Sequence, residues 1–285
     1  MKKAIVVVVL IVANPLLVGC SHFVSKAADS FGNNQTGAIF NQDDPALVRA
    51  GMPSYILLLD SFLQGEEDNP AILSAAATMY ASYGSVFADD PARAKRLTRR
   101  AREYPGQAMC MTLAASCNWR GLPYDAFVAS LQQVNSKQAD QLYAYGFAFL
   151  AYIRAHSDDW NALAELPQAE AVMQHYIDIS GTSAEASAHN YLGILMTIRP
   201  PALGGKQDEA RGHFDAAIAM SGGQDLSPKV EMLKGIARTL YDRELNDQLC
   251  AEILGASPYA DGYTLTNVMA QEEALDLCSQ ADDYF

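Results

Sequence analysis

The sequence predicts an all-α fold, and two observations support this class. From Asp43 onward, apolar residues recur at helical spacing, and no sustained stretch alternates apolar and polar residues as a strand would. Several helix starts carry a capping side chain before a proline, which suits the first helical turn because it has no amide hydrogen to leave unbonded. These starts are Asp43-Asp44-Pro45, Asn69-Pro70 and Asp89-Asp90-Pro91.

The expected helices follow in order from these starts and from the period. The first runs from Pro45 and bends at Pro53, the second runs from Pro70 to about Phe87, and the third begins at Pro91. Further helices are expected over residues 123–134, 137–156, 159–179, 183–198, 206–220, 227–254 and 266–281. Their succession predicts helical hairpins.

One hairpin has the residue pattern of a tetratricopeptide repeat. Gly193 lies on its first helix, and Ala210, Phe214 and Ala217 follow on its second at spacings of four and three; residues 80–101 form a weaker copy. Small residues at these positions let two helices approach closely, and such hairpins bury their apolar faces only by stacking. We therefore expect tetratricopeptide-like hairpins stacked into a compact superhelix.

The N-terminus has the parts of an export signal. Met1-Lys2-Lys3 is cationic, and the apolar run over residues 4–13 is too short to span a membrane comfortably. Leu17-Val18-Gly19-Cys20 resembles the lipobox, in which a bacterial lipoprotein is cleaved before the cysteine and acylated on it. The alternative is an ordinary secretory signal with a chance cysteine. We expect a signal peptide over residues 1–19 and lipidation at Cys20.

A lipid anchor predicts where the protein resides. Acyl chains on Cys20 would hold it firmly, because each buried methylene contributes about 0.8 kcal/mol. Ser21 follows the cysteine, which by resemblance to Gram-negative lipoproteins favours the periplasmic face of the outer membrane. Residues 20–42 are expected to be the lipidated cysteine and a flexible tether without helical or strand period. A single all-α domain is expected over residues 43–285.

Composition excludes one class of partner. The 285 residues include 20 basic and 33 acidic side chains, a net charge of -13 that becomes -15 once Lys2 and Lys3 are removed with the signal peptide. So acidic a chain lacks the basic footprint that a nucleic-acid backbone requires, and charge alone would not hold it on anionic lipid. No nucleic acid is expected as a partner.

Motifs for catalysis or metal binding are absent from the sequence. It has no His-Glu-x-x-His, no glycine-rich phosphate loop, no Gly-x-Ser-x-Gly and no Cys/His metal spacing. Glu185 and His189 share a helix face, as do His213 and Ala217, and a surface pair is preferred over a metal site. We expect no enzymatic activity, no cofactor and no metal.

The cysteines after Cys20 would meet an oxidising compartment. Cys110 and Cys117 lie about 10 Å apart on a continuous helix, so they can pair only if the helix ends between them. Residues 118–123 contain a glycine and a proline that favour a nearby helix end. The sequence therefore does not decide whether Cys110 and Cys117 are bonded. Cys250 and Cys278 are expected to be buried and unpaired on helix faces.

A proline- and glycine-rich loop precedes the helix expected from residue 206. It could seat an anion on free amides, or it could be a structural turn whose second glycine adopts a positive φ. We prefer the structural turn. Its residues are Pro200, Pro201, Leu203, Gly204 and Gly205.

A run of basic residues is a candidate docking strip. Its side chains occupy two neighbouring helix faces, Arg93, Arg96 and Arg100 on one and Lys95, Arg99 and Arg102 on the other. A solvated face that balances nearby acids is the preferred interpretation. The alternative is docking of an acidic partner, where charge would govern association rate and orientation.

Aromatic and small residues alternate over residues 141–152. In a helix, Tyr143 and Phe147 form one stripe, and Tyr145 and Phe149 lie on a second. A helix that is apolar on two faces packs between neighbours or lines a hollow. Core packing is preferred, whereas tyrosines around a cavity would suit a ligand with an apolar body and a polar tip.

Two amides share one face of the last long helix. Asn267 and Gln271 stand among residues that are otherwise apolar or small. Buried amides need partners, so they either bond the preceding helix near Asp242 or point into a wet cavity. The structural role is preferred.

Several of these stretches resemble the TatT family, the T component associated with TRAP (tripartite ATP-independent periplasmic) transporters. The most specific are Tyr191-Leu192-Gly193, residues 200–206 and residues 210–214. Further matches lie at residues 44–53, 56–59, 79–84, 93–104, 264–271 and 282–285. The resemblance covers the mature domain, loosely over residues 105–180.

The resemblance implies a helical lipoprotein with a channel through each protomer, self-association as trimers, docking to a TRAP-type periplasmic solute-binding protein, and hydrophobic or amphipathic ligands. The candidate ligand or channel residues are Tyr143, Tyr145, Phe147, Phe149, Tyr191, Asn267 and Gln271, and the candidate docking residues are Arg93, Arg96, Arg99 and Arg100. A non-enzymatic, lipid-anchored accessory protein of a TRAP-type system is the leading hypothesis. The alternative is a helical-repeat scaffold for envelope assembly without a ligand.

Overall fold

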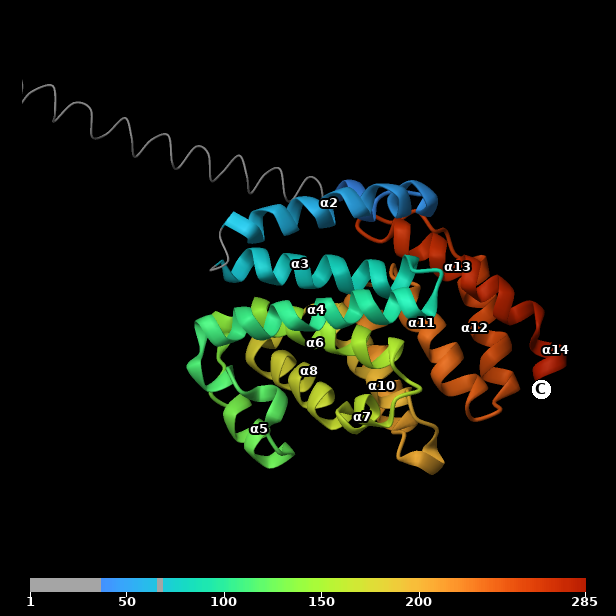
Figure 1. Ribbon diagram of the computed structural model, residues 1–285. Coiled ribbons are helices and arrows are strands. Elements are labelled where there is room, and N and C mark those ends of the chain that lie inside the picture. Colours follow the sequence, from blue (N-terminus) through green and yellow to red (C-terminus); the bar gives the residue numbers. More distant parts are fainter. Residues whose placement is uncertain (1–36, 66–68) are drawn as a thin grey trace, which may run out of the picture.

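The computed structural model describes residues 37–65 and 69–285, and these ranges contain helices, turns and no strand (Figure 1). The all-α prediction is confirmed. The expected signal peptide and Cys20 lie outside the described residues. Residues 37–40 form a helical turn, and Asn41 bonds the Asp261 carboxylate and the Gly262 amide at 2.8 and 2.6 Å. The last residues of the expected tether are therefore structured.

The N-terminal helices begin where the capping pattern predicts. They are α2 (Pro45–Gly65), α3 (Pro70–Ser82), which continues as a π-helical turn (Tyr83–Phe87), and α4 (Pro91–Thr112). The side chain of Asn69 accepts two amide hydrogens of the first turn of α3, and Asp90 does the same for α4. These bonds satisfy donors that the helix itself leaves free.

The middle of the chain surrounds a central helix. The helices are α5 (Tyr124–Leu131), α6 (Ala139–Ala155), α7 (Trp160–Ala164) and α8 (Leu166–Ser180). α6 contacts α3, α4, α8 and the later α9. The helix expected over residues 159–179 is two helices, because the chain turns at Glu165 and restarts with Pro167 in the first turn of α8.

The C-terminal part forms two hairpins and a connecting segment. Its helices are α9 (Ala186–Thr197), α10 (Gln207–Met220), α11 (Ser227–Met232) with a π-helical turn (Leu233–Arg238), α12 (Arg243–Gly255), α13 (Thr264–Ser279) and α14 (Ala281–Tyr284). The single helix expected over residues 227–254 was wrong. Tyr241 adopts a left-handed φ of 56°, and Asp242 caps α12 by accepting the Leu245 amide at 2.9 Å.

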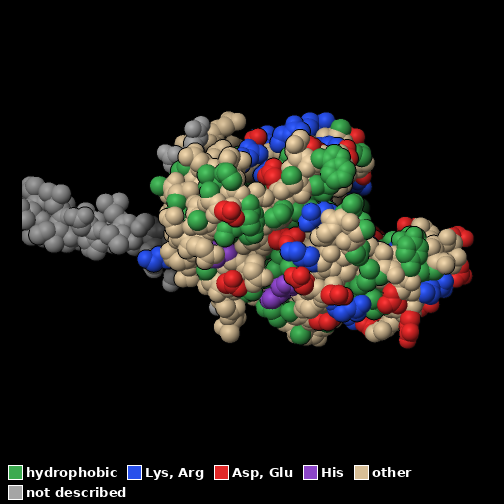
Figure 2. Space-filling model, turned by 90° about the horizontal axis from the view of Figure 1, so that it is seen from below, with side chains coloured by type: hydrophobic (Ala, Val, Ile, Leu, Met, Phe, Trp, Pro, Cys, Tyr) green, Lys and Arg blue, Asp and Glu red, His purple; other side chains and the backbone are tan. Residues whose placement is uncertain are grey.

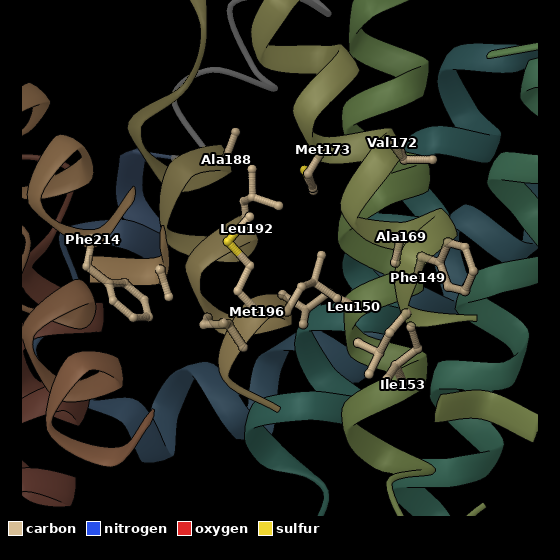
Figure 3. Close-up of a cluster of buried hydrophobic side chains, with 14 of the residues drawn as sticks. Phe149, Leu150, Ile153, Ala169, Val172, Met173, Ala188, Leu192, Met196 and Phe214 are labelled. Atoms are coloured by element: carbon tan, nitrogen blue, oxygen red, sulfur yellow. The ribbon is translucent and has the colours of Figure 1, made fainter. Parts of the chain in front are cut away.

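The larger hydrophobic core is built around α6. In Figure 3, side chains of α6 face those of α8 and α9, and Phe214 of α10 packs behind α9. Gly193 on α9 makes this fit possible, since a Cβ there would lie 2.7 Å from the Phe214 ring. The close approach expected from the spacing of small residues is therefore present in the α9–α10 hairpin.

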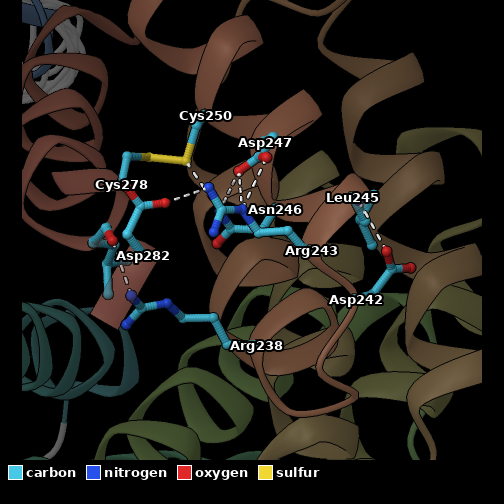
Figure 4. A network of polar contacts seen from close by, with 10 residues as sticks. Arg238, Asp242, Arg243, Leu245, Asn246, Asp247, Cys250, Cys278 and Asp282 are labelled. Atoms are coloured by element: carbon cyan, nitrogen blue, oxygen red, sulfur yellow. Dashed lines mark hydrogen bonds and ion pairs between the residues drawn. A yellow bond between two sulfur atoms is a disulfide. The ribbon is translucent and has the colours of Figure 1, made fainter. Parts of the chain in front are cut away.

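Two disulfides join pairs of cysteines that are consecutive along the described chain. α4 ends at Thr112, between Cys110 and Cys117, so their Cα atoms approach to 4.4 Å and the two residues are bonded. Cys250 and Cys278 are also bonded, which corrects the expectation that they are unpaired (Figure 4). The α12–α13 hairpin brings their Cα atoms to 5.9 Å, an approach that helical period alone does not reveal.

Candidate functional site

Tyr143 and Phe147, on one stripe of α6, face Tyr191 of α9. We call these three aromatic side chains the aromatic end. The rings of Phe147 and Tyr191 stack with centroids 4.9 Å apart, and Tyr143 lies 5.1 Å from Tyr176 and 6.1 Å from Tyr191. The Tyr143 and Ser187 hydroxyls are 2.6 Å apart. Burial raises the pKa of the Tyr143 and Tyr191 phenols, which therefore stay neutral hydrogen-bonding groups.

Asn267 holds an acidic loop beside the aromatic end. Its amide accepts the Leu226 amide hydrogen at 2.9 Å and donates to the Gln224 carbonyl at 2.8 Å, so it fixes the residues on both sides of Asp225. Burial raises the pKa of Asp225, and its charge adds to the burial that raises the pKa of Tyr191. Asn267 is fully buried, and its three partners are backbone groups of loops.

Gln271 bonds the helix that precedes its own, but not near Asp242. Its amide donates to the Ile253 and Ala256 carbonyls at 2.9 and 2.8 Å, which terminate α12. The expected neighbourhood of Asp242 was therefore wrong for both amides. Asn267 and Gln271 thus donate to backbone carbonyls in loops and at the end of α12, where carbonyls lack helical partners.

The far end of the same α6 stripe meets a charged cavity, which we call the ionic end. The cavity has a volume of about 260 Å³. Arg154 and Lys234 contact the Glu231 carboxylate at 3.1 and 3.0 Å, and Lys234 also contacts Glu273 at 2.8 Å. Burial opposes ionisation of Glu231, yet the two cations hold its pKa below the usual value. The remaining lining is Ser157, Ile194, Thr197, Ile198, Gly235 and Thr239.

The aromatic end and the ionic end both lie between α6 and α9. Phe147 and Arg154 follow Tyr143 by four and eleven residues, so all three lie on one face of α6, over about 16 Å at 1.5 Å per residue. On α9, Ile194 and Ile198 follow Tyr191 by three and seven residues and lie on one face. The helices therefore connect an aromatic, neutral end to a charged one.

Tyr145 and Phe149 lie on the other stripe of α6, as the sequence predicted, and do not join the aromatic end. Tyr145 meets the edge of Trp119 at 5.2 Å. The Arg102 guanidinium lies over the Phe149 ring, 4.2 Å from its centroid. These two ligand candidates thus face a separate cluster, which borders a second cavity of about 510 Å³ beside the Cys110–Cys117 disulfide.

The basic run is partly engaged within the molecule. Arg93 lies over the Tyr83 ring at 5.1 Å, and Arg100 contacts Asp60 at 3.1 Å. Lys95 pairs with Asp158 and Arg102 with Glu165. Among the described residues, Arg96 and Arg99 are exposed without an ion-pair partner. Basic side chains gather along one edge of the face in Figure 2, while acidic and basic ones intermix elsewhere.

The loop before α10 is a tight structural turn. Gly204, the first glycine, has a left-handed φ of 84°. The expectation that the second glycine, Gly205, adopts a positive φ was therefore wrong. Gly205 is required for another reason, because a Cβ there would clash with the Arg199 carbonyl oxygen. The Gly204 and Gly205 amides bond the Pro201 and Pro200 carbonyls, so neither is free for an anion.

The sequence did not single out four polar residues of this region: Arg154, Asp225, Glu231 and Lys234. The position of Arg154, eleven residues after Tyr143, was an available signal, since it continues the stripe. The pairing of Arg154 with Glu231 spans 77 residues and had no local signal. No group of three or more His, Cys, Asp or Glu suited to a metal occurs in the part of the chain that the structure describes.

The described helices enclose aromatic and ionic side chains and border a cavity, so the fold and the site define an all-α protein with a candidate binding cavity. The model of one family, TAtT (TRAP transporter T-component), matches residues 41–285. The chain therefore belongs to the TRAP transporter T-component family, as the resemblance predicted. Membership assigns it an accessory role in a TRAP system and an envelope-associated location, in a family that is not one of enzymes. No curated protein matches the chain.

Proposed function

We propose that the protein is a lipid-anchored periplasmic accessory protein that binds an amphipathic small molecule between α6 and α9 and passes it to or from a TRAP-type solute-binding protein. The observation that carries this proposal is the sharing of two helix walls by the aromatic and ionic ends. Phe147 and Tyr191 offer an apolar surface to the body of such a ligand. Arg154 and Lys234 offer cations to its polar end.

The charge balance supports a polar rather than a strongly anionic tip. Glu231 and Glu273 already neutralise the two cations of the ionic end. A ligand with one acceptor group could share a guanidinium or ammonium hydrogen without displacing either carboxylate. Hydroxyls of Tyr143 and Ser187 give the aromatic end its own polar contacts. A ligand with an apolar body and a small polar group would match the chemistry of the side chains at both ends.

The test is native mass spectrometry of the full-length protein extracted from membranes. Ile198 lines the ionic end, so Ile198→Trp should fill the cavity and reduce the fraction of protein recovered with bound ligand at least fivefold. Leu203→Trp is the matched control, because Leu203 is exposed on the loop before α10 and should leave recovery unchanged. Equal recovery from both variants would contradict binding at this site.

The same spectra examine assembly and anchoring. We propose trimers, acylation of Cys20 at the periplasmic face of the outer membrane, and docking of the solute-binding protein on the basic strip.

The docking is tested by association kinetics. Arg96→Glu with Arg99→Glu should slow association with a negatively charged partner and flatten its salt dependence, since these two arginines have no ion pair among the described residues. Unchanged on-rates at low salt would remove the strip from the proposal. Docking without any recovered ligand would favour the scaffold hypothesis.

A further inference from the structure

The outward face of α2 is apolar and has no covering element among the described residues. Leu57 is 68% exposed, Leu47 57%, and Phe62, Leu58 and Tyr55 between 36% and 49%. On an α-helix, Leu47, Leu57 and Leu58 lie on the side opposite Met52 and Ile56, which are buried against the second hydrophobic cluster. Tyr55 and Phe62 lie at the flank between the outward and the buried side. Patches of this kind mark interaction surfaces.

Both charged side chains of α2 are turned away from this face. Arg49 pairs with Asp89 and donates to the Phe87 carbonyl at 3.2 Å. Asp60 accepts from the Tyr80 and Tyr104 hydroxyls at 2.7 and 3.0 Å and pairs with Arg100. The outward side is completed by small or hydroxyl residues, Ala50, Ser54 and Ser61. A chain with a net charge of -13 thus presents a face without ionised groups.

Length and hydropathy distinguish α2 from the other described helices. It alone among them is long and apolar enough to cross a membrane, with a mean hydropathy of 1.3. Its inner side, however, packs on α3 and on the turn that follows α3. A helix held by one side against a folded core lies along a surface rather than across it.

A lipid surface is the occupant that the chain favours, an argument that rests on the anchor in the proposed function. Cys20 precedes Gly37, the first described residue, by 17 residues, which span at most about 58 Å at about 3.4 Å each. A tether of this length keeps α2 at high local concentration near the bilayer. An uncharged face also avoids the repulsion that the acidic body would meet at anionic lipid.

We propose that the outward face of α2 lies in the interface of the membrane that carries the anchor and so orients the helical body. α2 runs along one edge of the molecule, and α5 lies toward the opposite edge (Figure 1). The α5 side would then point away from the bilayer. The basic strip on α4 would lie between these two levels and stay accessible to a soluble partner.

Quenching by brominated lipid tests this contact. The full-length lipoprotein carrying Leu57→Trp is reconstituted into phosphatidylethanolamine and phosphatidylcholine vesicles with plain or dibrominated acyl chains. We expect the added fluorescence to be at least twofold lower in the brominated vesicles, after subtraction of the unsubstituted protein, which has two tryptophans. Leu203→Trp is the control and should show no added quenching, because its position is on the loop before α10. Equal intensities for Leu57→Trp in both vesicles would overturn the proposal.

A second copy of the chain is the competing occupant. If it covers α2, Leu57→Trp is unquenched, and Leu57→Glu with Leu58→Glu lowers the mass measured by sedimentation in detergent; this pair of results overturns the proposal. The mass of the N-terminal peptide reports acylation separately. Quenching without acylation would refute the anchor and support the α2 contact, whereas acylation without quenching would do the opposite.

Discussion

The α9–α10 and α12–α13 hairpins border the candidate site and are held together in different ways. In α9–α10 the backbone approaches closely at two glycines, Gly193 against Phe214 and Gly205 against Arg199. In α12–α13 a disulfide and the amides of the second helix make the connection. The first hairpin depends on the absence of side-chain atoms, and the second on polar and covalent bonds.

Gly205→Ala should have the largest effect on this comparison. The new Cβ would overlap the Arg199 carbonyl oxygen, and since that atom is backbone, the loop itself must move. We expect a loss of about 4 kcal/mol in the free energy of unfolding, measured by urea denaturation with circular dichroism. Gly212→Ala, on the open side of α10, is the control and should be neutral or slightly stabilising. Similar losses for both would mean that the close approach is unimportant.

Removal of the Cys250–Cys278 bond should have the next largest effect. The two residues are 28 positions apart, and opening such a loop should cost about 3 kcal/mol through the entropy of the unfolded chain. Cys250→Ser with Cys278→Ser should therefore lower the urea midpoint. Cys110→Ser with Cys117→Ser opens a loop of only seven positions and should cost less. The reverse order would contradict an entropic origin.

Asn267→Leu should cost about 2 kcal/mol, because it strands the Leu226 amide and the Gln224 and Pro258 carbonyls. Gln280→Leu, on the exposed end of α13, is the control and should change little. Thermal unfolding of both variants measures the difference. A neutral Asn267→Leu would mean that its partners bond water instead, as they would at the wall of a wet cavity.

Asp225→Asn should have the smallest effect, with a sign that depends on pH. Burial raises the pKa of Asp225 above its ordinary 3.8, so ionisation of the folded protein weakens it as pH rises. The variant should be more stable than the original at pH 7, and the difference should vanish below pH 3.8, where both side chains are neutral. Asp225 accepts the Ser227 amide hydrogen at 2.9 Å. A variant that is less stable at pH 7 would show that this bond to the charged carboxylate outweighs the cost of burying the charge.

Much of the fold was predictable because its signals are local. Asn69 and Asp90 cap their helices through residues two and three positions away, and the Gly193–Phe214 contact follows a spacing within one hairpin. The break at Tyr241 was missed, since no glycine or proline marks it and the left-handed φ is imposed by the surroundings. Local chemistry therefore predicts where helices begin better than where a long helix is interrupted.

The candidate site was predictable on one helix only. The division of α6 into a Tyr143–Phe147 stripe and a Tyr145–Phe149 stripe follows from helical period, but period does not say which stripe meets α9. The partners of Asn267 lie 9 to 43 positions away in loops, which no pattern in the sequence announces. The sequence therefore does not predict the contacts between residues that are far apart along the chain.

The order of the disulfides has a consequence for export. The four cysteines of the described chain pair in consecutive order, the first with the second and the third with the fourth: Cys110 with Cys117 and Cys250 with Cys278. A thiol oxidase that acts on the polypeptide as it leaves the translocation pore would join correct partners in the order of their emergence. Maturation of this protein should then proceed without a disulfide isomerase, and a strain that lacks one should still yield both native bonds.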